Sequence, residues 1–86
     1  MPFVVYILQC ADTTLYVGCT NDLTKRLHQH NHLTSGAQYT KGRRPVKLVY
    51  SENFKSLKKS RAREAAIKRL SRTAKIKLIA AGAVLH

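Results

Sequence analysis

The sequence predicts an α+β fold in which helices pack against a small, mainly antiparallel sheet. Two short apolar runs, rich in β-branched and aromatic residues, lie close together near the N-terminus, as the strands of a hairpin do. A third run of alternating polarity follows near the middle, and the last third of the chain has a helical pattern. The expected order is strand, strand, helix, strand, helix, helix.

The first two strands are expected at residues 3–8 and 15–19, joined by the polar, turn-like segment 11–14. Cys10 and Cys19 lie at or near strand ends. Two thiols make no disulfide framework, and their spacing is not that of a metal site. We therefore expect ordinary reduced cysteines in or near the core.

A helix should begin just before Leu23, because the preceding Thr-Asn-Asp sequence is typical of an N-cap, and it should run to about Asn31. Leu23, Arg26, Leu27 and His30 share one face of this helix. Arg26 thus lies beside leucines that must face the core, whereas a merely solvated basic residue would normally point away from them.

The second half begins with a loop at 33–45, which is long for a compact domain, and long loops are often functional. A third strand is expected at 46–51 and a helix at 56–70. A last helix should end at about Ala81, before Gly82.

Net charge is the strongest compositional signal, since 16 Lys and Arg oppose four Asp and Glu to give +12. A polyanion is the expected partner, and nucleic acid fits best because phosphate contacts supply most non-specific binding. The alternative is a basic protein with no anionic ligand. No signal peptide, membrane span or membrane-surface helix is indicated, so the cytoplasm is the expected location. The 86 residues predict one domain (1–86), with its core at about 3–80.

Glu64 is the only acid after Asn53, in a segment that holds ten of the sixteen basic residues. Helical geometry places Glu64 on the apolar side of its helix or at the edge of that side. A carboxylate there requires a compensating charge. That charge could be a salt bridge to Arg26 or to a helix lysine. It could also be a divalent cation, since magnesium takes one or two carboxylates together with water and phosphate.

The aromatic and histidine residues allow structural and functional readings. His28, His30 and His32 do not share a helix face, which disfavours a histidine metal site. Tyr6 and Tyr16 fit the expected strands simply as sheet aromatics. The long loop interleaves an aromatic with cations, which suits base stacking with phosphate contact, although Tyr39 could instead pack the loop onto the domain.

The chain resembles the GIY-YIG nucleases over roughly residues 3 to 80, and within them the small stand-alone bacterial members of uncharacterised role (UPF0213-like). The two motifs that name the family match Val4-Val5-Tyr6 and Tyr16-Val17-Gly18. The order and spacing of the following residues make the combination more specific than either short motif; these are Asn21-Asp22-Leu23, Lys25-Arg26-Leu27, His30 and Glu64.

The resemblance implies a three-stranded antiparallel sheet flanked by helices, and a set of roles. Tyr6 would act as general base or position the attacking water, and Tyr16 would hydrogen-bond near the scissile phosphate. Gly18 would let the backbone and the substrate approach each other closely. The remaining roles are transition-state charge stabilisation by Arg26, positioning or proton transfer by His30, and binding of Mg²⁺ or Mn²⁺ by Glu64.

The chain departs from the family pattern in its secondary site residues. Val4 stands where the motif name has Gly. Some members carry an Asn late in the domain, but no Asn follows Asn53 here, and Lys75 or another basic residue is the candidate for that position. Tyr39 is the candidate replacement for a loop His found in other members.

Together with the basic charge, the resemblance implies a metal-dependent endonuclease that hydrolyses DNA, with single-stranded or structured DNA favoured. Two alternatives are a non-catalytic basic module, whose binding would be independent of metal and weakened by salt, and a nuclease acting on RNA. We expect a monomer or a weak homodimer. The predicted nucleic-acid contacts are Tyr39, Lys41, Arg43, Arg44, Arg63, Lys68 and Lys75.

Overall fold

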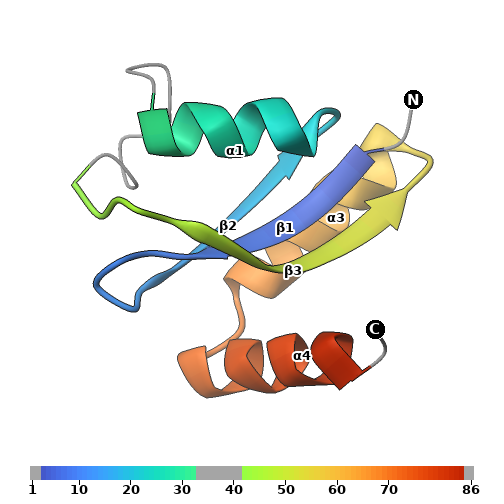
Figure 1. Cartoon of the computed structure of the whole chain (residues 1–86). Helices are drawn as coiled ribbons and strands as arrows, with labels where there is room; N and C mark the ends of the chain where they lie inside the picture. Colours follow the sequence, from blue (N-terminus) through green and yellow to red (C-terminus); the bar gives the residue numbers. More distant parts are fainter. Residues whose placement is uncertain (1–2, 33–41, 85–86) are drawn as a thin grey trace.

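The computed structural model describes residues 3–32 and 42–84 and shows the predicted α+β fold. A central antiparallel sheet has the strand order β2-β1-β3, and helices lie on both of its faces (Figure 1). The elements in chain order are β1 (Phe3–Gln9), β2 (Leu15–Thr20), α1 (Leu23–His32), β3 (Lys47–Phe54), α3 (Leu57–Lys68) and α4 (Arg72–Val84).

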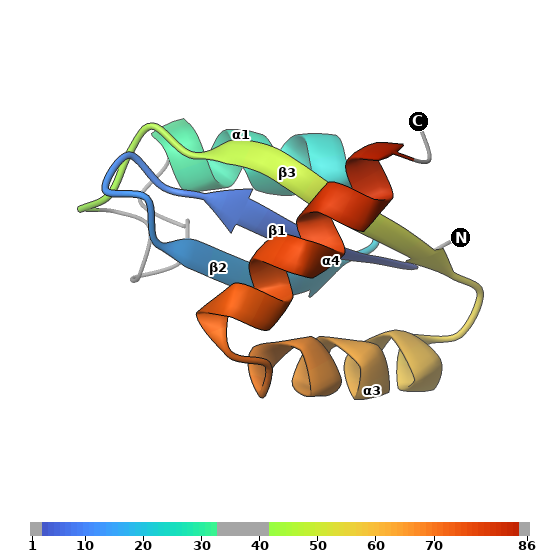
Figure 2. The same cartoon turned by 90° about the horizontal axis from the view of Figure 1, so that it is seen from below.

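Helices α1, α3 and α4, which lie in the described part of the chain, divide between the two faces of the sheet. Helix α1 covers one face, and α3 and α4 cover the other (Figures 1 and 2). Figure 2 shows α3 alongside the edge strand β2, while α4 crosses the sheet. The C-terminal end of β2 therefore lies between α1 on one face and α3 on the other.

Each face of the sheet has its own core, because successive strand residues point to opposite sides. Beneath α3 and α4 the buried residues are Val5, Ile7, Val17 and Ile67, with Leu78 and Ile79 packed against them. Beneath α1 they are Tyr6, Leu8, Cys10 and Val46, with Tyr16, Leu23 and Leu27 packed against them. The predicted inward face of α1 is thus confirmed.

Strand β3 departs from simple alternation. Its register with β1 shifts between Ile7, which pairs with Tyr50, and Leu8, which pairs with Leu48. Val49 is the extra residue, and both Val49 and Tyr50 pack toward the α3 and α4 side. An extra residue of this kind breaks the period of two, so a strand pattern read from sequence fails at this point.

Helix α4 continues through Gly82 to Val84, so the predicted end near Ala81 was wrong. Gly82 lies against the ring of Tyr50, and a Cβ atom at this position would be 2.8 Å from that ring. The glycine permits close packing of helix against sheet and does not end the helix. Within the described ranges, no helix has the length and apolarity needed to cross a membrane.

Candidate active site

The face of the sheet beneath α1 brings two tyrosines and a histidine together. The Tyr6 hydroxyl lies 3.0 Å from His30 Nε2, and the two side chains are only 1% and 0% exposed. The Tyr16 ring centroid lies 5.0 Å from that of His30, in an edge-on arrangement. Strands β1 and β2 thus supply the tyrosines and α1 supplies the histidine, as predicted.

Gly18 is required by the position of Tyr6. The two residues are paired across β1 and β2, and the Tyr6 ring lies directly over the glycine. A Cβ atom at position 18 would be 2.4 Å from the Tyr6 hydroxyl oxygen, closer than real Cβ contacts come. The third residue of the second motif therefore has a packing reason, namely to leave room for the catalytic candidate Tyr6.

Burial and neighbouring charges shift the pKa values of both hydrogen-bonded groups. Burial raises the pKa of Tyr6 to about 12, Arg26 acts to lower it, and the charge of Glu64 adds to the increase. Burial and the charges of Arg26 and Arg44 lower the pKa of His30 to about 4. Both groups are therefore neutral near pH 7, and His30 Nε2 can accept the hydrogen bond that the Tyr6 hydroxyl donates.

Arg26 lies half-buried on α1, where its Nη1 donates to Gln29 Oε1 at 3.0 Å. It lines a hollow of about 190 Å³ at the start of the helix, together with Lys25 and with Thr20 and Asn21 at the end of β2. Because Arg26 lines this hollow and also lowers the pKa of Tyr6, it lies between the buried cluster and the surface.

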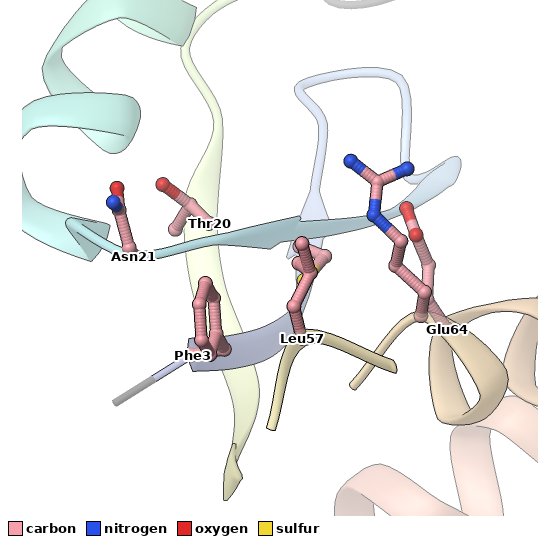
Figure 3. Close-up of a pocket in the computed structure, with 7 residues that line it drawn as sticks. Phe3, Thr20, Asn21, Leu57 and Glu64 are labelled. Atoms are coloured by element: carbon pink, nitrogen blue, oxygen red, sulfur yellow. The ribbon is translucent and has the colours of Figure 1, made fainter. Parts of the chain in front are cut away.

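Glu64 lies on α3 at a second hollow, of about 380 Å³, whose other polar lining residues are Thr20, Asn21 and Arg61 (Figure 3). Its side chain is 20% exposed, and Oε2 lies 3.3 Å from Lys68 Nζ, one turn further along the helix. The salt bridge to a helix lysine, one of the readings left open by the sequence, is thus present. Thr20 and Asn21 line both hollows, so these hollows adjoin at the end of β2.

The position of α1 is fixed at both ends by hydrogen bonds. Asp22 caps its N-terminus, where Oδ1 accepts from the Lys25 amide at 3.1 Å. Asn31 exchanges two hydrogen bonds with the backbone of Val46, at 2.8 and 3.0 Å. Arg44 Nε donates to the His30 carbonyl at 2.6 Å, near the C-terminal end of the helix, where a cation is favourable. These contacts hold His30 in place over Tyr6.

Several cations predicted to contact nucleic acid have partners within the protein. Arg43 Nε lies 3.0 Å from an Asp12 oxygen, and Arg63 Nε lies 3.2 Å from Glu52 Oε1. The Tyr50 hydroxyl also donates to Glu52, which joins β3 to α3 through a local network.

The other predicted contacts are distributed around the fold. Arg44 binds helix carbonyls, and Lys68 pairs with Glu64. Lys75 lines a separate hollow with Thr14, Leu15 and Arg72. Tyr39 and Lys41 lie outside the described residues.

The structure adds residues to the site that the sequence did not predict. Thr20, Asn21 and Arg61 join its polar lining, while Phe3 and Leu57 form an apolar end. Arg61 had a signal, because it precedes Glu64 by three residues and so shares its helix face. Asn21 lies in a segment that carries the family resemblance, and the others come from separate elements and had no signal for this site in the sequence.

The donors around Glu64 are compatible with a hard divalent cation. One carboxylate shares the hollow with a threonine hydroxyl and an asparagine side chain, and all three can offer oxygen ligands. Magnesium commonly binds through one or two carboxylates and retains several waters. Within the described ranges, no three His, Cys, Asp or Glu side chains gather as a ligand set. The residues therefore fit a site built on Glu64 and completed by water and phosphate.

Comparison with known proteins places this arrangement in a family. A model described as the GIY-YIG catalytic domain matches residues 2–77. A UPF0213 protein of Syntrophus aciditrophicus is 55% identical over 75 residues, covering 87% of this chain and 86% of that protein. A UPF0213 protein of Clostridium perfringens is 49% identical over 80 residues, covering 93% and 85%.

Solved structures agree with this placement. The solution structure of a UPF0213 protein from Bacillus halodurans is 39% identical, with a TM-score of 0.61, over 93% of this chain and 84% of that one. A solution structure from E. faecalis is 32% identical, with a TM-score of 0.69, over 100% and 91%. The predicted sheet with flanking helices is confirmed by these similarities as well as by the structure.

Proposed function

Because the chain belongs to the GIY-YIG catalytic-domain family, which indicates a nuclease, we propose that it is a metal-dependent endonuclease. Its proposed reaction is hydrolysis of phosphodiester bonds in DNA, with single-stranded or structured DNA preferred. The net charge of +12 supports a polyanionic substrate.

One observation carries the proposal, namely that the hollow of Arg26 and the hollow of Glu64 share Thr20 and Asn21. A phosphate at this junction would have a permanent cation on one side and a metal-binding carboxylate on the other. The charges of Arg26 and Glu64 both act on the buried Tyr6 hydroxyl, so each of these two side chains lies within electrostatic range of Tyr6.

Glu64 is the proposed metal ligand, and oxygens of Thr20 and Asn21 line the same hollow. When bound, Mg²⁺ or Mn²⁺ would supply positive charge to the phosphate and to the leaving oxygen. Arg26 would donate hydrogen bonds to the phosphate oxygens on which negative charge develops, as a rigid and always charged fork. Its half-buried position strengthens this interaction, because the local dielectric is lower than in water.

For Tyr6, the geometry supports positioning of the attacking water more than general base catalysis. A hydroxyl with a pKa of about 12 is scarcely ionised at neutral pH. The Tyr6 hydroxyl can donate a hydrogen bond to neutral His30, which leaves an oxygen lone pair able to accept a hydrogen bond from water. His30 is thus proposed to fix the orientation of the Tyr6 hydroxyl, and Tyr16 packs against the His30 ring.

A cleavage assay tests the proposal. End-labelled single-stranded, duplex and branched DNA, and RNA of matching sequence, would each be incubated with Mg²⁺, Mn²⁺ or EDTA. We expect internal cuts with either metal and none in EDTA, with faster cutting of single-stranded or branched DNA than of duplex. Salt-sensitive binding without cutting under any condition would favour the non-catalytic binding module, and cutting confined to RNA would move the substrate to the other nucleic acid.

A further inference from the structure

The hollow beside Glu64 has two chemically different ends. Phe3 and Leu57 form an apolar end, and Arg61 and Glu64 form a charged end. In the view of Figure 3, Leu57 stands between Phe3 and Glu64, with Thr20 and Asn21 above the Phe3 ring. The hollow is therefore apolar near the start of β1 and charged along α3.

The apolar end is suited to a flat, uncharged surface. Leu57 is the first residue of α3 and is 43% exposed, so part of this residue is open to solvent at the wall of the hollow. Phe3 presents a half-buried aromatic ring next to it. Nucleobases stack on such rings irrespective of sequence, because every base has a π-face.

The charged end is suited to a phosphate. Arg61 and Glu64 are three residues apart on α3, so they share a helix face and both reach the hollow. The Arg61 side chain is exposed, and an arginine can bind a phosphate through two parallel hydrogen bonds. A metal ion on Glu64 would add a second attraction at the same end.

The size of the hollow is compatible with one nucleotide. Its volume of about 380 Å³ falls within the usual range for small-molecule sites, roughly 300 to 1,000 Å³. A base within a duplex has both faces covered by its neighbours and cannot stack on Phe3 without leaving the helix. The Asn21 side chain, which has both a donor and an acceptor, lies where it can meet a base edge.

We propose that this hollow binds one unpaired nucleotide next to the scissile phosphate, with its base stacked on Phe3 and Leu57 and its phosphate on Arg61. This inference rests on the proposed nuclease function for the identity of the neighbouring phosphate. It supplies a physical reason for a preference for single-stranded or structured DNA, because an unpaired base would have to be available beside the cut.

Binding without cleavage tests the proposal independently of the chemistry. The probe is a short single-stranded oligonucleotide with one 2-aminopurine, bound to the Glu64→Gln variant in EDTA. Stacking on Phe3 should quench the fluorescence beyond the level in the free strand. Phe3→Ala should abolish this added quenching and weaken binding by about 5- to 150-fold, while Phe3→Tyr should retain both.

Matched variants separate the hollow from general charge and hydrophobicity. Leu57→Ala should weaken binding, whereas Leu70→Ala, which removes another exposed leucine, should not. Arg61→Ala should weaken binding and reduce the slope of log affinity against log salt concentration by about one phosphate contact. Arg69→Ala should change both quantities less.

Equal quenching and affinity of the Glu64→Gln variant with and without Phe3→Ala would overturn the proposal, as would equal effects of the Leu57 and Leu70 changes. If the cleavage assay fails while the quenching depends on Phe3, the binding site stands and the nuclease proposal falls.

Discussion

The buried cluster beneath α1 and the open hollow on α3 differ in how far the protein satisfies its own polar groups. Tyr6 and His30 are fully buried and hydrogen-bonded to each other, and the absence of a side chain at Gly18 leaves room for the Tyr6 ring. Arg61 and Leu57, in contrast, present exposed side chains to a hollow. The difference indicates that the first region fixes geometry and the second receives ligand. Substitutions that disturb the packing of the first region should therefore lower stability, whereas substitutions in the second should change mainly binding and catalysis.

Gly18→Ala should have the largest effect, because the added Cβ would overlap the buried Tyr6 ring. Overpacking of this kind typically costs about 1–3 kcal/mol, and we expect the upper end because strand backbone must move. Urea unfolding would measure the change in the free energy of unfolding. Gly42→Ala is the matched control, because nothing lies within 4 Å of its added Cβ. Equal stabilities of the two variants would contradict the packing role of Gly18.

Acid should destabilise the buried cluster through His30. Its pKa falls from 6.5 to about 4 on folding, so the unfolded chain binds more protons between these values. The contribution of neutral His30 is complete above pH 6.5 and is lost as the pH falls toward 4; its full size is roughly 3 kcal/mol. Urea unfolding at pH 7 and pH 4 would show that the free energy of unfolding falls less on acidification for His30→Gln than for the original chain.

His28→Gln serves as the control for that comparison, because His28 is exposed on the same helix. The account would fail if both variants lost as much stability on acidification as the original chain does.

Arg26 lies between the two regions, and its replacement should affect turnover more than affinity. Arg26→Ala should lower the turnover number by roughly a hundredfold, as loss of a preorganised donor does. Single-turnover cleavage with saturating enzyme would separate this effect from binding. Lys25→Ala, which removes a neighbouring cation from the same hollow, should change mainly the apparent affinity. A purely affinity-based effect at both positions would make Arg26 a binding residue.

The smallest effect concerns the ion pair within the open region. Lys68 is 55% exposed, and exposed pairs of this kind contribute about 0.2–1 kcal/mol. Lys68→Ala should release Glu64 and reduce the Mg²⁺ concentration for half-maximal cleavage by up to about fivefold. Lys58→Ala controls for the change in net charge. Identical metal titrations of the two variants would mean that the Glu64–Lys68 pair does not compete with metal.

Local patterns predicted most of the fold. The apolar runs gave β1 and β2, and the leucine spacing gave the inward face of α1. The extra residue Val49 and the close approach of Tyr50 to Gly82 could not be read locally, because each depends on a neighbouring element.

For the candidate site, too, the sequence predicted some residues and missed those that depend on neighbouring elements. Tyr6, His30 and Glu64 were predicted as site residues from their spacing and the resemblance, and the structure shows Tyr6 and His30 in contact, which the sequence did not predict. The apolar wall of the hollow was missed, because Phe3 and Leu57 meet only after α3 has packed beside the sheet. The salt bridges of Arg43 and Arg63 were also missed, since each joins residues distant in sequence, and a count of cations does not show which are already paired.

The central claim, that the open region carries the metal-dependent chemistry, is tested most directly by comparing two carboxylate variants. Glu52 is structural, bound by Arg63 and Tyr50, whereas Glu64 faces the hollow. Cleavage of labelled single-stranded DNA in Mg²⁺ would be measured for Glu64→Gln and Glu52→Gln, with binding measured in EDTA. We predict that Glu64→Gln binds DNA but does not cut it, while Glu52→Gln is less stable and still cuts. Full cleavage by Glu64→Gln would contradict the account.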